Sequence, residues 1–113
     1  MPHLIPFLIP LAMVAAEPRY FDTGNQLFEL CQQSDAFSRG LCFGTISGVH
    51  DGILALGWTC PNSAGVTRGQ VRDVVVQHLY QNPQFRQHPA PFLVIEALMQ
   101  RMGCQGPMPP PSR

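Results

Sequence analysis

The stretch "RGLCFGTISGVHDGILALGW", residues 39–58, decides the fold because it combines an apolar stripe at helical spacing with glycine at every fourth position. On a helical wheel the apolar side chains fall within about 80° of one another. They are Cys42, Ile46, Val49, Ile53 and Leu56. The opposite side carries Gly40, Gly44, Gly48 and Gly52, with Ser47, Asp51 and Ala55 among them.

Glycine inside a helix costs roughly 1 kcal/mol relative to alanine, so four of them on one side call for a packing role. A helix side without large side chains lets another backbone approach closely. Two explanations remain open. Either this is the central helix, contacted on both sides, or the glycine side is a surface that forms a homodimer or binds a partner protein. Asp51 on this side is expected to bond to a neighbouring helix or loop.

Two capping boxes predict the helices on either side of this stretch. Thr23-Gly24-Asn25-Gln26 begins a helix that runs to about Gln33, and a polar loop from Ser34 to Ser38 follows it. Thr67-Arg68-Gly69-Gln70 begins another helix, which stops before Asn82-Pro83. The apolar stripe of that helix includes His78, which is expected to be a buried histidine with a satisfied partner.

Proline at position 91 suits the first turn of a last helix, which Gly103 can close. The predicted buried stripe of this helix is Phe92, Ile95, Leu98, Met99 and Met102. No alternating strand pattern of useful length occurs in the chain. The sequence therefore predicts an all-α fold, a small four-helix domain stapled by two disulfides.

The four cysteines favour disulfides over zinc, because the chain has no C-x2-C pair and its cysteine spacings fit no common zinc site. Cys42 and Cys60 lie at opposite ends of the glycine-rich helix, about 25 Å apart at 1.5 Å per residue, which excludes that pair. The connectivity that joins Cys31 to Cys104 is excluded with it. In an up-down bundle we favour Cys31–Cys42 and Cys60–Cys104, while the remaining connectivity stays open.

The two ends of the chain are expected to lie outside the folded domain. Residues 1–16 are predicted to be a secretory signal peptide, because an apolar run from Leu4 to Val14 leads into small residues at Val14-Ala15-Ala16, and the run is too short for a membrane anchor. We therefore expect export to the periplasm, a helical domain over residues 17–104, and a disordered proline-rich tail over residues 105–113.

Charge and composition narrow the kind of partner. The chain has seven arginines, seven acidic residues and no lysine, so it is neutral. Nucleic acid and anionic membranes attract clustered positive charge, which argues against both as the main partner. No cofactor or metal site is expected.

The only adjacent acid-base pair is His50-Asp51. Neighbouring residues on a helix point about 100° apart, so they are poorly placed to orient one another as a catalytic triad requires. Cysteines paired in disulfides are not nucleophiles. The chain is therefore expected not to be an enzyme.

Taken together, the ordered cysteines and glycines, Asp51, Cys60-Pro61, the stretch Tyr80-x-x-Pro83 and "PFLVIEAL" before Cys104 resemble the Rap/Tai-type immunity proteins. The resemblance covers about Leu27 to Cys104. It implies a small, exported, helical and commonly dimeric protein that protects a bacterium from peptidoglycan amidases delivered by type VI secretion. In that family a surface element enters the amidase's active-site groove and excludes its substrate.

The match does not say which residues contact the amidase, so exposure alone nominates two polar loops, residues 34–39 and 62–68. The candidate residues are Ser34, Asp35, Arg39, Asn62, Ser63 and Arg68. Two other binding functions remain as alternatives. One is a small periplasmic chaperone of the acid-stress type. Carboxylates would drive the loosening of such a chaperone at low pH, and the few acidic residues of this chain are scattered. The other is an apolar ligand carrier with a cavity lined by Phe92, Leu98, Met99 and Met102.

Overall fold

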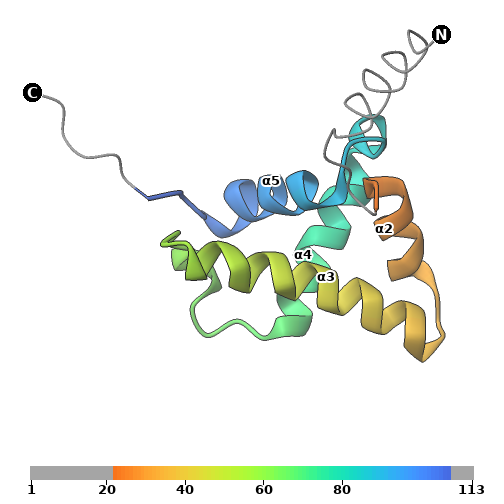
Figure 1. Ribbon diagram of the computed structural model, residues 1–113, viewed down its shortest axis with the longest axis horizontal. Coiled ribbons are helices and arrows are strands. Elements are labelled where there is room, and N and C mark those ends of the chain that lie inside the picture. Colours follow the sequence, from red (N-terminus) through yellow and green to blue (C-terminus); the bar gives the residue numbers. More distant parts are fainter. Residues whose placement is uncertain (1–21, 108–113) are drawn as a thin grey trace, which may run out of the picture.

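The computed structural model describes residues 22–107, and this part of the chain folds into four α-helices without a strand (Figure 1). The helices are α2 (Gly24–Gln32), α3 (Ala36–Ala55), α4 (Arg68–Gln81) and α5 (Ala90–Met102). Two short 3₁₀ turns, η2 (Pro61–Ser63) and η3 (Pro83–Phe85), lie on either side of α4. The predicted all-α fold is confirmed. The predicted signal peptide and most of the predicted disordered tail lie outside the described residues.

Both predicted capping boxes are present. At the start of α2, the Thr23 hydroxyl accepts from the Gln26 amide at 3.3 Å, and the Gln26 side chain accepts from the Thr23 amide at 2.8 Å. Thr67 and Gln70 make the same reciprocal pair at the start of α4, with distances of 3.1 and 2.8 Å. These bonds satisfy backbone donors that have no partner within the helix, and so they set where α2 and α4 begin.

The glycine-rich helix α3 begins earlier than predicted. The expected polar loop from Ser34 to Ser38 is wrong over its second half, because the helix starts at Ala36. Asp35 is the N-cap, and its Oδ2 accepts from the Ser38 amide at 2.9 Å. Aspartate is a preferred N-cap residue, so Asp35 indicates a helix that begins at the next residue, inside the predicted loop.

Figure 1 shows α3 as the longest helix, with α5 beside it and α2 near its N-terminal end. The buried positions of α3 are Cys42, Ile46, Ser47 and Ile53. Leu56, predicted to complete the stripe, is instead 74% exposed. Leu56 is the C-cap residue of α3, so it lies just past the end of the helix, where the helical spacing that predicted the stripe no longer applies.

The buried face of α5 is rotated relative to the prediction. Phe92 and Met99 are 54% and 50% exposed, whereas Leu93, Val94, Ala97, Leu98 and Met102 are buried. Nearly every residue from Phe92 to Met99 is apolar, so periodicity alone could not choose the face. Packing of α5 against α3 and α4 determines which of its faces is buried. The cavity suggested for a ligand carrier is therefore absent, because its four residues divide between the core and the surface.

Two disulfides staple the domain, and they join the cysteines that the helix layout paired. Cys31–Cys42 connects α2 to α3, with α carbons 5.1 Å apart. Cys60–Cys104 connects the segments that follow α3 and α5, with α carbons 4.0 Å apart. Beside the second bond, Thr59 and Gln105 exchange backbone hydrogen bonds of 3.0 and 2.8 Å. The ordered fold thus extends past Cys104, to where Gly106 lies against the Trp58 ring.

Candidate partner-binding surface

The glycine side of α3 is open. A Cβ atom built on Gly40, Gly44, Gly48 or Gly52 would meet nothing within 4 Å among the described residues. The first explanation of the glycine row, a central helix contacted on both sides, is therefore wrong for a single copy of residues 22–107. The other three helices pack against α3 but leave these four glycines uncovered.

Large apolar side chains flank the open glycines. Phe37 and Leu41, near the start of α3, are 75% and 42% exposed. Leu56 lies exposed at the other end of the helix. Exposed apolar side chains that gather on one helix side are a feature of protein interaction sites. We call Phe37, Leu41, Gly48 and Gly52 the open face of α3.

Asp51 does not bond to a neighbouring helix or loop, contrary to expectation. Its carboxylate is exposed, and its one ion pair within residues 22–107 is to the adjacent His50, with Nδ1 and Oδ1 3.6 Å apart. That distance is too long for a direct hydrogen bond. Asp51 therefore has an acceptor surface available to solvent or to a partner.

The His50 ring holds a loop in place. Its Nε2 lies 3.2 Å from the Ser63 hydroxyl, and this hydroxyl donates to the Cys60 carbonyl at 2.8 Å. The single hydroxyl proton is used on Cys60, so the serine accepts from the histidine. A catalytic serine does the reverse and donates its proton to the histidine. The contact therefore serves to attach η2 to α3.

His78 is a buried histidine with satisfied partners, as predicted. Its Nε2 lies 2.9 Å from Oε1 of Glu96, and Arg101 donates from Nε to Nδ1 at 3.5 Å. These contacts link α4 to α5 inside the fold. Both ring nitrogens are occupied, so His78 is placed for packing and not for contact with a substrate.

The nominated loop residues divide into two groups. Ser34 and Asp35 lie at the connection before α3, where the Asp35 carboxylate is engaged as a cap. Asn62 and Ser63 lie in η2, and the Asn62 amide packs against Gly103 at the end of α5. These four do not share a site. Arg39 lies in the first turns of α3 and is no longer part of a loop.

Arg39 and Arg68, nominated from different loops, do lie at one place. With Arg72 and Phe43 they line a groove of about 470 Å³ between α3 and α4. Gly40 and Gly44 form part of its wall. We call this site, defined by Arg39, Arg68, Arg72 and Phe43, the arginine groove.

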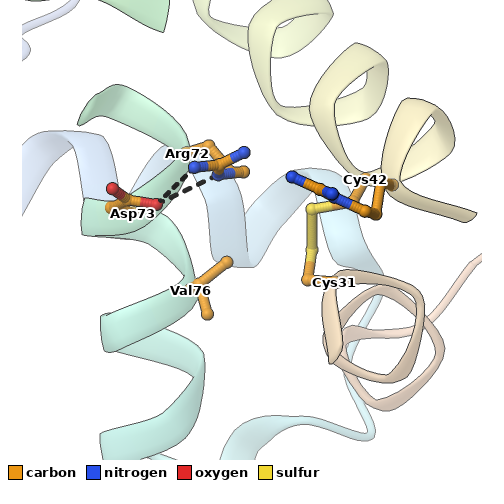
Figure 2. Close-up of a pocket in the computed structure, with 6 residues that line it drawn as sticks. Cys31, Cys42, Arg72, Asp73 and Val76 are labelled. Carbon is orange, nitrogen blue, oxygen red and sulfur yellow. Dashed lines mark hydrogen bonds and ion pairs between the residues drawn. A yellow bond between two sulfur atoms is a disulfide. The ribbon is translucent and has the colours of Figure 1, made fainter. Parts of the chain in front are cut away.

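Sequence reasoning missed Arg72 and Phe43. The signal for Arg72 was its spacing of one helical turn from Arg68 on α4. Its guanidinium bonds to Asp73 through Nε and Nη2, at 3.0 and 2.9 Å, and lies over the Phe43 ring, 5.4 Å from the centroid. Figure 2 shows Arg72 and Asp73 across an adjoining pocket from the Cys31–Cys42 disulfide, with Val76 on the same helix as Arg72 and Asp73.

Among residues 22–107 there is no group of three or more histidine, cysteine or acidic side chains that could hold a metal ion. In the same part of the chain, no helix is both long enough and apolar enough to cross a membrane. The surface features that these residues do show are the open face of α3, the adjacent arginine groove, and a disulfide that joins α2 to α3.

The fold and this surface define a small, disulfide-stapled helical binding protein. A family model described as Rap1a immunity proteins matches residues 23–104, from the N-cap of α2 to the last cysteine. The chain belongs to the Rap1a immunity protein family. No curated protein matches the chain.

Proposed function

We propose that this protein is an exported immunity protein that binds a peptidoglycan amidase delivered by type VI secretion and blocks its active site. The observation that carries the proposal is the family match, which spans the whole described fold from Thr23 to Cys104. The protein acts by binding and not by catalysis. The periplasm is its place of action, because an amidase that cuts peptidoglycan must be stopped there and disulfides form there.

The open face of α3 supports a homodimer as part of this function. Its glycines have free space above them, and its exposed apolar side chains would be covered by a second copy. Close approach of two backbones across glycine gains van der Waals contact along the whole helix. A dimer would also place two copies of the arginine groove beside the shared face, because Gly40 and Gly44 border both.

The test is a protection assay. Peptidoglycan amidases, beginning with any encoded next to this gene, are directed to the periplasm of a test bacterium with or without this protein, and survivors are counted. We expect rescue by the full chain and none by a chain lacking residues 2–16. Purified protein should then inhibit the same amidase on isolated peptidoglycan.

Two controls separate function from folding. A variant with all four cysteines replaced by serine tests whether rescue needs the stapled fold. An active-site variant of the amidase, which does not kill, should still bind in a pull-down. Failure of the folded, disulfide-bonded protein to protect against any amidase would contradict the proposal and favour a chaperone function.

A further inference from the structure

The arginine groove contains positive charge that the chain does not neutralise. Arg39 and Arg68 make no side-chain hydrogen bond or ion pair with any other residue in the described range 22–107. They come from different helices and face the same space. Both side chains are exposed, so water solvates them in the free protein, and a complementary charge on a partner would gain attraction from both.

Arg72 has a different part in the groove. Asp73 balances its charge, and the Phe43 ring lies under its guanidinium. These two contacts fix the orientation of its planar group, because arginine on an aromatic face loses little further freedom when it binds. Arg72 therefore supplies a pre-positioned guanidinium in the groove that the two unpaired arginines also line.

The glycine wall makes the groove accessible to a polypeptide. Gly40 and Gly44 have nothing within 4 Å of a built Cβ, so a bound chain can bring its backbone against α3. The volume of about 470 Å³ lies within the range of sites that hold a few groups of a ligand. The groove thus has room for a short segment with one or two side chains.

We propose that the arginine groove binds a carboxylate-bearing segment, with aspartate or glutamate side chains, on the protein that this chain inhibits. Arginine pairs with carboxylate through two parallel hydrogen bonds, which gives direction as well as attraction. Nucleic acid and an anionic membrane surface are disfavoured as ligands, because the chain is neutral and has no lysine, and Asp73 lies beside the groove. This inference rests on the proposed function and adds the chemistry of the contact.

The first test uses whichever amidase the protein binds. Arg39→Gln with Arg68→Gln removes both unpaired charges, and Gln77→Glu with Gln100→Glu changes the net charge by the same amount on exposed positions outside the groove. Affinity is measured by titration calorimetry at several salt concentrations. We expect the arginine variant to bind about tenfold or more weakly with a shallower salt dependence, and the control to bind within about threefold of the parent.

Unchanged affinity of the arginine variant would overturn this inference and leave the proposed function intact. Both variants must keep the helical circular dichroism and both disulfides of the parent. None of the four replaced side chains makes a bond within the described residues, so both variants are expected to fold.

A second test does not depend on the amidase. Hexaglutamate, hexaglutamine and phosphatidylglycerol vesicles are each added at low salt, and the arginine Nε–H signals are followed by NMR. We expect hexaglutamate to shift Arg39, Arg68 and Arg72 more than Arg86 and Arg101, and the double glutamine variant to lose the effect. Equal shifts at all arginines, equal response to hexaglutamine, or stronger binding to vesicles would each overturn the inference.

Discussion

Glu96 on α5 contacts the buried imidazole of His78 on α4, with Oε1 2.9 Å from Nε2. Arg101 donates to the other ring nitrogen, so Nδ1 is an acceptor and the ring proton lies on Nε2, pointing at the carboxylate. The His78 ring is almost fully buried, and its two hydrogen bonds join α4 to α5. An aliphatic side chain at this position could pack but could not make these bonds.

His78→Ala should therefore destabilise the fold by about 2–4 kcal/mol, because it leaves a cavity and removes both hydrogen bonds. The measurement is urea unfolding followed by circular dichroism at neutral pH. His88→Ala, at an exposed position where the ring stacks on Phe85, is the matched control and should change the free energy of unfolding by less than about 1 kcal/mol. Similar losses for both variants would show that the His78 contacts add nothing.

Gly24 is a glycine that the fold requires. A Cβ there would overlap Cδ1 of Leu93 and lie 2.9 Å from the Arg86 carbonyl oxygen. Gly24→Ala should cost about 1–3 kcal/mol, because the backbone carbonyl cannot move aside easily. Gly69→Ala is the control, since its Cβ would meet atoms no nearer than 3.8 Å. Thermal unfolding of both variants should give a lower melting temperature for the first alone.

A substitution at Gly48 tests the proposed dimer contact without lowering the stability of a single copy. Gly48→Leu should keep or raise the stability of the single copy, because the site is open and leucine is a better helix former. The same substitution should convert the proposed dimer to a monomer in light scattering coupled to gel filtration. Gln100→Leu adds the same side chain on α5 and should leave the mass unchanged. If the Gly48→Leu variant is still a dimer, the open face is not the dimer contact.

Asp35 should make α3 sensitive to acid. The backbone N–H of Ser38, and then the Ser38 side chain, bond to the carboxylate and hold the pKa of Asp35 below its ordinary value. A carboxyl whose pKa is lower in the folded state stabilises the fold above the unfolded-state pKa, near 3.8, and this stabilisation is lost as pH falls through the folded-state value.

The pH dependence of the melting temperature tests this assignment. Asp35→Asn keeps an N-cap acceptor without the charge, so we expect near-parental stability at neutral pH and a smaller loss below about pH 4. Asp35→Ala removes the cap and should be less stable than Asp35→Asn at every pH. An acid-side loss in Asp35→Asn as large as in the parent would contradict the role of this carboxylate.

The two disulfides should differ in their contributions. They close loops with sequence separations of 11 and 44 residues. In the chain-entropy description these loops correspond to about 3 and about 4 kcal/mol. Replacing Cys60 and Cys104 by serine should thus destabilise the fold more than replacing Cys31 and Cys42. Denaturant unfolding of the two double variants gives the comparison, and the reverse order would mean that native-state packing outweighs loop closure.

Local signals predicted most of the fold. Thr23 and Thr67 each form a capping box with the residue three positions on, and this geometry depends on a few neighbouring residues. Asp35 carried a signal of the same kind, and overlooking it placed the start of α3 too late. Helix length excluded a Cys42–Cys60 bond, since a rigid helix keeps these residues far apart, and an up-down arrangement favoured the pairing that the structure has. Each of these inferences depends on distances along the chain.

The sequence by itself determined the four helices, their caps and the cysteines that could meet, because backbone hydrogen bonding and helix rise act locally. Only the tertiary structure decided which face of α5 is buried, that the glycine row stays open, and that Arg39 and Arg68 share a groove. Those outcomes depend on how helices distant in sequence cross, and crossing is set by the packing of whole side-chain surfaces against one another. No spacing within one helix encodes that packing.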